Sequence, residues 1–157
     1  MEYSRITDSV LIGTTPGQRD FERLHTMGVR LVINMRFLWG RPPADGAPAI
    51  EYLSLRSFDS PLVPIPMNTL VRGTRAALAV IRKHGSVYVH CSRGRHRSVA
   101  MAAAILIAQG STSGAAMQLI KERHAAADPD ASHIRARIVE FERIWRAQVG
   151  SALPDAA

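Results

Sequence analysis

The apolar run from Val99 to Ala108 constrains the fold more than any other part of the chain. Its ten residues are all apolar, so a helix that contains them has no polar side to turn toward water. Such a helix needs neighbouring elements on every side. Ten residues are too few to cross a bilayer, which takes about 20. We therefore expect a helix over Ser98–Ala108 in the middle of a folded domain.

Strands and helices alternate around this run. Short β-rich apolar segments predict strands, and apolar residues at helical spacing predict helices. The expected strands are Val10–Gly13, Val29–Met35, Ile50–Leu55 and Val87–His90. The expected helices are Gln18–His25 (with Thr15 and Pro16 as cap and first turn), Met67–His84, Ser98–Ala108, Ser113–Arg123 and Ala131–Val149. This alternation predicts an α/β domain with a central, mainly parallel sheet flanked by helices.

The length of 157 residues fits a single domain. We expect the domain to cover residues 1–150 and residues 151–157 to form a flexible tail. The stretch Met1–Arg5 is polar and no apolar segment of a signal peptide follows it, so neither secretion nor a transmembrane segment is predicted. The expected location is the cytoplasm.

The net charge of +7 is unevenly distributed. No acidic residue occurs between Asp59 and Glu122, whereas eight basic residues do: Arg72, Arg75, Arg82, Lys83, Arg93, Arg95, Arg97 and Lys121. A field of this kind attracts anions. Charge alone leaves nucleic acid, acidic lipid and phosphorylated small molecules open as ligands.

The segment His90–Ser98 (HCSRGRHRS) joins an expected strand to an expected helix. A short loop that enters a helix points its backbone N–H groups inward and can bind a tetrahedral anion. Gly94 permits a tight turn, and the helix N-terminus with the nearby arginines lowers the pKa of the Cys91 thiol. Arg97 can hold two phosphoryl oxygens at once. The expected phosphate-binding residues are Ser92, Arg93, Gly94, Arg95, His96 and Arg97.

With its His-Cys-x5-Arg-Ser signature, the chain resembles the protein tyrosine phosphatase-like enzymes, and its short length resembles their dual-specificity branch. The resemblance extends roughly from Ile6 to Arg143 and includes the segments VRLVINM, VYVH and IKERH. It implies a phosphate monoester hydrolase in which Cys91 forms a phosphocysteine intermediate and Arg97 binds the phosphoryl group. Such an enzyme needs neither a metal nor a cofactor.

The resemblance also assigns roles to three further residues. The family's general acid is an Asp about thirty residues before the Cys; Asp59 has this spacing, although Asp59-Ser60-Pro61 is also a typical turn. The hydroxyl of Ser98 would help the thiolate to leave, or would cap the helix. His90 would orient the loop. The other histidines, His25, His84, His124 and His133, are isolated in the sequence and suggest no metal site.

The basic loop residues bear on the substrate. Arg93, Arg95 and His96 resemble the loops of lipid and phosphoinositide phosphatases, especially the mitochondrial-type enzymes that act on phosphatidylglycerophosphate. His96 departs from the small residue usual at its position, which narrows the expected site. Three arginines that follow expected strands could meet a second anion: Arg36, Arg41 and Arg56. A phosphorylated protein and an acidic phospholipid both remain open as substrates.

Other classes fit less well. A rhodanese or arsenate reductase would also use a Cys loop, but a reductase needs further cysteines and the chain has one. A non-catalytic module that binds phosphate or RNA is a second alternative. An RNA-binding domain would show aromatic stacking platforms, whereas aromatics are 6% of the chain and scattered. A phosphatase that had lost its activity would normally have lost Cys91 or Arg97, and both are present. Nucleic acid is therefore not an expected partner, although an RNA triphosphatase on the same fold remains an alternative.

Overall fold

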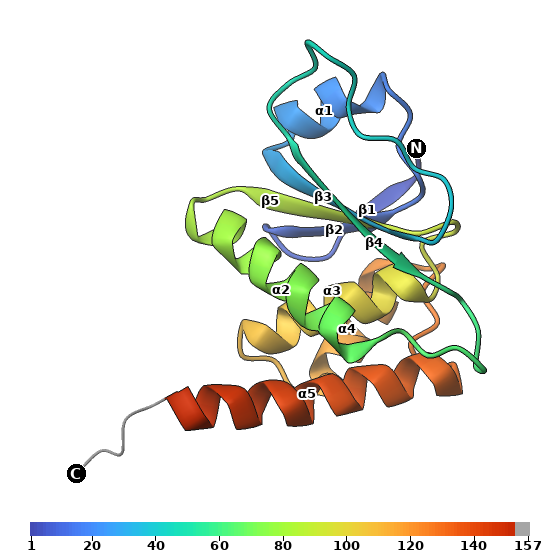
Figure 1. The fold of residues 1–157 in the computed structure, drawn as a ribbon, viewed down its shortest axis with the longest axis vertical. Helices are drawn as coiled ribbons and strands as arrows, with labels where there is room; N and C mark the ends of the chain where they lie inside the picture. The colour runs from blue at the N-terminus through green and yellow to red at the C-terminus, as the bar shows by residue number, and fades with distance from the viewer. Residues whose placement is uncertain (153–157) are drawn as a thin grey trace.

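Five strands form one sheet in the order β1-β2-β5-β3-β4 (Figure 1). The computed structural model describes residues 1–152. The strands are β1 (Tyr3–Arg5), β2 (Val10–Gly13), β3 (Val29–Arg36), β4 (Glu51–Ser57) and β5 (Ser86–His90). The pairs β2–β5, β5–β3 and β3–β4 are parallel, and β1 pairs with β2 in the antiparallel sense. The predicted single α/β domain with a mainly parallel sheet is confirmed.

The helices cover the two faces of the sheet unequally. They are α1 (Asp20–Thr26), α2 (Met67–Arg82), α3 (Arg97–Ala108), α4 (Ser113–Arg123) and α5 (Ser132–Ala152). The short α1 lies on one face, and the other four gather on the opposite face (Figure 1). No helix within residues 1–152 has both the length and the apolar character needed to span a membrane.

The apolar run that opened the sequence analysis forms α3, as predicted. Every residue from Ser98 to Ile107 is buried, because α3 packs against the sheet on one side and against α2, α4 and α5 on the others. The main core contains α3, the sheet face beneath it and the inner sides of these helices. A smaller core, built around Phe21, Leu24 and Tyr88, fills the space between α1 and the other face of the sheet.

Two details of the N-terminal region differ from the prediction. Strand β1 was not expected, because it is only three residues long and polar; its backbone pairs with β2, with Tyr3 opposite Gly13. Helix α1 begins at Asp20 rather than at Gln18. The Asp20 carboxylate accepts a hydrogen bond from the Gly17 backbone N–H at 2.8 Å, which closes a turn before the helix. The Thr15 hydroxyl, predicted as a cap, instead contacts the Cys91 carbonyl at 3.4 Å.

The last helix is longer than predicted. α5 continues to Ala152, two residues into the segment that was expected to form a tail. The rest of that segment, residues 153–157, lies outside the described part of the chain.

Candidate active site

The loop between β5 and α3 lies at the carboxyl edge of the parallel strands, where ligands of such sheets bind. Cys91 follows the last residue of β5, and α3 begins at Arg97. Gly94 has a φ of +66°, in the left-handed region. A Cβ atom at this position would lie 3.0 Å from His124 Nε2 and 3.2 Å from the Gly13 carbonyl oxygen. Both the backbone conformation and the space therefore favour glycine.

The Cys91 thiol is buried at the bottom of this loop, with 2% of the residue exposed. Its Sγ lies 3.2 Å from the hydroxyl oxygen of Ser98. Burial raises the pKa of the Cys91 thiol, but the Ser98 hydroxyl and the backbone N–H groups of Ser98, Arg93 and Arg95 outweigh this effect and lower the pKa below its ordinary value. The loop thus favours a thiolate, as the sequence predicted.

The guanidinium of Arg97 is fixed by two backbone carbonyls. Nη1 donates to Ser57 O at 2.9 Å and to Met35 O at 3.3 Å. Met35 lies within a register irregularity between Asn34 and Arg36, at the end of β3. The Nε of Arg97 is buried and makes no hydrogen bond with any described residue. A buried donor of this kind calls for an acceptor, and a phosphoryl oxygen in the loop would provide one.

A cavity of about 280 Å³ opens above the loop. Its lining contains the predicted nucleophile, general acid and loop cations: Asp59, Cys91, Ser92, Arg93, Arg95, His96 and Arg97. A second hollow of about 480 Å³ adjoins it, lined by Arg93, Arg95, Asp128 and the small side chains of residues 125–127. Arg93 and Arg95 line both spaces and therefore stand between them.

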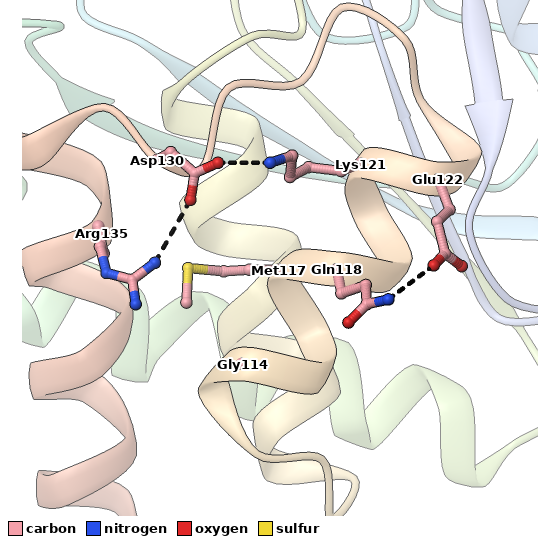
Figure 2. A pocket seen from close by; sticks show the side chains of 7 residues that line it. All are labelled: Gly114, Met117, Gln118, Lys121, Glu122, Asp130 and Arg135. Carbon is pink, nitrogen blue, oxygen red and sulfur yellow. Dashed lines mark hydrogen bonds and ion pairs between the residues drawn. The ribbon is translucent and has the colours of Figure 1, made fainter.

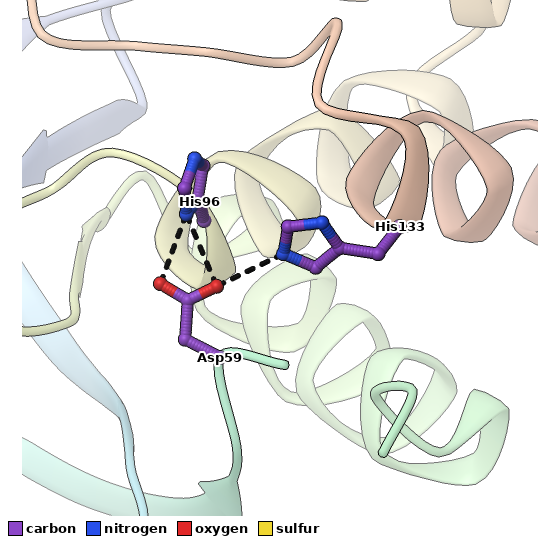
Figure 3. A group of neighbouring side chains, drawn as sticks. All are labelled: Asp59, His96 and His133. Carbon is purple, nitrogen blue, oxygen red and sulfur yellow. Dashed lines mark hydrogen bonds and ion pairs between the residues drawn. The ribbon is translucent and has the colours of Figure 1, made fainter. Parts of the chain in front are cut away.

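The predicted general acid reaches the mouth of the cavity. Asp59 accepts hydrogen bonds from His96 Nδ1, at 2.9 and 3.1 Å, and from His133 Nε2, at 3.0 Å (Figure 3). Burial raises the pKa of the Asp59 carboxyl, but the hydrogen bonds from His133 and His96 outweigh it and hold the pKa below its usual value. His96, which was expected to narrow the site, contacts this carboxylate through Nδ1.

Sequence reasoning missed the partners of three loop residues. His133, at the start of α5, binds Asp59, and Asp128 forms an ion pair with Arg95 at 3.1 Å. Arg95 is therefore partly neutralised rather than a free cation. The ring of His124 donates from Nε2 to the Gly94 carbonyl at 2.9 Å, and its Nδ1 lies 2.9 Å from the Ser4 hydroxyl oxygen.

These contacts left no local signal in the sequence, because each joins residues about thirty or more positions apart. The only hint was the resemblance of the IKERH segment, which ends with His124.

The remaining residues singled out from the sequence, one histidine and three arginines, lie outside the cavity lining. His90 is completely buried on β5, and burial lowers the pKa of its ring to about 4, so the ring is neutral at ordinary pH. Arg36 donates to the Thr15 hydroxyl at 2.9 Å, next to the Cys91 backbone, and so supports the loop. Arg41 and Arg56 are exposed.

Another hollow, of about 470 Å³, lies between α4 and the start of α5 (Figure 2). Three of its charged residues form ion pairs, Asp130 with Lys121 and with Arg135, and Glu122 accepts a hydrogen bond from Gln118. It contains no nucleophile. Although this hollow is larger than the cavity over Cys91, its chemistry gives no reason to place a reaction there.

Comparison with known proteins gives related phosphatases. No family model matches the chain. It is 28% identical to dual specificity phosphatase 28 of Mus musculus over 93% of this chain and 87% of the relative. It is 38% identical to phosphatidylglycerophosphatase and protein-tyrosine phosphatase 1 of Rattus norvegicus over 67% of this chain and 58% of the relative.

Solved structures agree with these relatives. The crystal structure of PTPMT1 matches with a TM-score of 0.82 and 28% identity, over 96% of this chain and 99% of that one. PTPMT1 in complex with PI(5)P matches with a TM-score of 0.78 and 28% identity, over 94% and 98%. From its fold, its Cys-Arg loop and these relatives, the chain belongs to the dual-specificity-like branch of the cysteine-dependent phosphatase superfamily and is a phosphatase.

Proposed function

We propose that Cys91 is the nucleophile of this phosphatase and that Arg97 binds the phosphoryl group. The observation that carries the proposal is the buried Cys91 sulfur, 3.2 Å from Ser98 Oγ, in the cavity that Arg97 also lines. In the first step the thiolate attacks phosphorus, an S–P bond forms and the P–O bond to the leaving group breaks. Arg97 stabilises the charge on the transferring oxygens. Asp59 in its protonated form gives its proton to the leaving oxygen, and because its pKa lies below the usual value this form is favoured by acidic pH.

In the second step water attacks the phosphocysteine. The Asp59 carboxylate accepts a proton from this water, an O–P bond forms, and the S–P bond breaks to release inorganic phosphate. The Ser98 hydroxyl donates a hydrogen bond to the departing thiolate, which lowers the barrier to its release. The balanced reaction converts a phosphate monoester and water into an alcohol and phosphate.

We further propose that the substrate is the phosphorylated headgroup of an acidic phospholipid. Arg93 and Arg95 stand between the catalytic cavity and the adjoining hollow, so a headgroup with a second anionic group can occupy both spaces. The proposal agrees with the name of the rat relative, a phosphatidylglycerophosphatase, and with the PI(5)P complex of PTPMT1.

An exposed apolar surface beside the cavity supports a lipid substrate. Phe37 and Phe58 stack with their ring centroids 4.2 Å apart, and Phe58 immediately precedes Asp59. Four further exposed apolar residues lie close to this pair in the sequence, because Leu38 and Trp39 follow Phe37, and Leu62 and Val63 come soon after Asp59. We call the six residues together the mouth patch. Exposed aromatic and aliphatic side chains beside arginines are suited to the boundary between lipid headgroups and acyl chains.

A phosphoprotein substrate is the second candidate, favoured by the similarity to dual specificity phosphatase 28 over most of both chains.

We also propose that residues 1–150 form the catalytic domain and that the protein is located in the cytoplasm.

A substrate panel tests these proposals. Purified protein is assayed on an aryl phosphate, on phosphotyrosine and phosphoserine peptides, and on vesicles with phosphatidylglycerophosphate or a phosphoinositide. We expect turnover of the aryl phosphate, and a kcat/KM for one of the lipids at least about tenfold above that for either peptide. Cys91→Ser should abolish all activities, and retained activity would refute the nucleophile. A peptide that exceeds both lipids would instead identify a protein phosphatase.

A further inference from the structure

Two imidazoles and one carboxylate meet at the mouth of the cavity, from three different elements. Asp59 follows β4, His96 ends the loop before α3, and His133 is the second residue of α5. Their ligand atoms all lie within 4.8 Å of one another. Figure 3 shows that both rings point at the same carboxylate, and the rings meet edge to face with centroids 5.2 Å apart. We propose that Asp59, His96 and His133 form a Zn²⁺ site that inhibits the phosphatase when occupied.

The distances are close to those of a metal site. Zn²⁺ binds imidazole nitrogen and carboxylate oxygen at about 2.0–2.1 Å, so neighbouring ligands of a tetrahedron are about 3.3 Å apart. His96 Nδ1 lies 2.9 and 3.1 Å from the Asp59 oxygens, and His133 Nε2 lies 3.0 Å from one of them. For these two pairs a separation of a few tenths of an ångström would admit the ion, and the nitrogens of His96 and His133 lie within 4.8 Å of each other.

Asp128 gives independent support from behind the site. Metal-bound histidines commonly direct their second ring nitrogen at a carboxylate, which fixes the tautomer. His96 uses Nδ1 toward Asp59, and its buried Nε2 lies 3.5 Å from an Asp128 oxygen. When the metal replaces the proton on Nδ1, the ring can keep its one proton on Nε2, facing Asp128. The Asp128 carboxylate is therefore already placed to accept a hydrogen bond from Nε2 of a metal-bound His96.

The set of donors selects the metal. Two imidazole nitrogens and one carboxylate oxygen suit Zn²⁺, whereas Mg²⁺ and Ca²⁺ prefer oxygen ligands throughout. Three protein ligands leave a fourth position for water. Zn²⁺ inhibits because it occupies the Asp59 oxygens that would exchange a proton with the substrate. The inhibition rests on the role proposed for Asp59, whereas the binding of Zn²⁺ does not.

Binding is tested directly on the chelator-treated full chain. Zn²⁺ is titrated in competition with a chromophoric chelator, and Co²⁺ serves as a spectroscopic probe of coordination. We expect one ion per chain, no displacement by millimolar Mg²⁺, and tetrahedral Co²⁺ bands without a thiolate-to-cobalt charge-transfer band. His133→Gln should weaken Zn²⁺ binding at least about tenfold, as should Asp128→Asn to a smaller extent. His25→Gln, outside the site, is the matched control.

Cys91→Ser separates this site from zinc bound at the nucleophile. Retained Zn²⁺ affinity in Cys91→Ser together with loss in His133→Gln supports the proposal. Loss in Cys91→Ser with retention in His133→Gln overturns it, as does unchanged affinity in both. Circular dichroism confirms that each variant is folded. If zinc binds as expected but does not inhibit the wild-type enzyme, the site stands and the role of Asp59 as general acid is wrong.

Discussion

The hydroxyl oxygen of Ser98, the second residue of α3, lies 3.2 Å from the Cys91 sulfur. This contact favours the thiolate and helps to hold the pKa of the Cys91 thiol below its ordinary value. Alkylation by iodoacetamide, followed across pH, should therefore give a midpoint below that of the same thiol in the urea-unfolded chain. Ser98→Ala removes one donor and should move that midpoint upward. A midpoint that does not change would mean that the backbone N–H groups alone stabilise the thiolate.

Arg97 should tolerate no replacement by lysine. Lysine keeps the positive charge but loses the planar fork, and it cannot bind the Met35 and Ser57 carbonyls and a phosphoryl group together. We expect kcat/KM on an aryl phosphate to fall by about 10²-fold or more, by analogy with the loss of an oxyanion donor. Arg72→Lys, on the exposed side of α2, is the control. Activity within a few fold of wild type would contradict the assigned role.

Asp59→Asn should discriminate between leaving groups. An alkyl phosphate needs a proton on its departing oxygen, whereas an activated aryl phosphate leaves readily without one. We expect the alkyl substrate to lose about 10²-fold or more in kcat and the aryl substrate much less. The assays contain a chelator, so that metal does not contribute. Equal losses on both substrates would reduce Asp59 to a turn residue.

The two loop arginines should differ in their effect on lipid substrates. Arg95 is paired with Asp128, whereas the side chain of Arg93 makes no ion pair with the described residues. Arg93→Ala should therefore lower kcat/KM on vesicle phospholipid about tenfold more than on an aryl phosphate, the loss expected for one charged hydrogen bond. Arg95→Ala should show a smaller difference between the two substrates. Equal losses on the lipid and the aryl phosphate in both variants would indicate that the two residues only support the loop.

His90 should make the protein sensitive to acid. Burial lowers the pKa of its ring from 6.5 to about 4, so the unfolded chain takes up a proton at a higher pH than the folded one. Its contribution is complete above pH 6.5 and is lost as the pH falls toward 4, with a total of about 3 kcal/mol.

Urea unfolding at pH 7, 5.5 and 4.5 measures this loss. In His90→Gln the free energy of unfolding should fall less steeply with acid than in the wild type. Equal slopes would show that other groups control acid unfolding.

Much of the fold followed from local pattern. The continuous apolar character of Val99–Ala108 predicted a helix buried on all sides, and α3 is one. The spacing of Cys91, Gly94 and Arg97 between a strand and a helix predicted the loop, and the cavity lies there. Such features depend on neighbours in the sequence, so periodicity and turn chemistry suffice to find them.

The contacts that complete the site depend instead on tertiary packing. Asp59 contacts His96 and His133, which lie 37 and 74 residues away in the sequence, and no local pattern predicts such contacts. The same holds for Arg95 and Asp128, which are 33 residues apart. Strand β1 was missed for a different reason, because its three residues gain their place from backbone pairing and not from apolar side chains.

His124 connects the outermost strand, β1, to the phosphate-binding loop. One ring nitrogen binds the Gly94 carbonyl and the other contacts the Ser4 hydroxyl, so two hydrogen bonds connect the sheet edge to the turn of the phosphate loop. Trimming the first five residues for protein production would therefore remove more than an edge strand. It would leave the His124 ring with only its bond to the Gly94 carbonyl, and we expect an enzyme that folds and yet binds phosphate less tightly. Ser4 thus contacts a support of the phosphate loop, although it lies 87 residues before the proposed nucleophile.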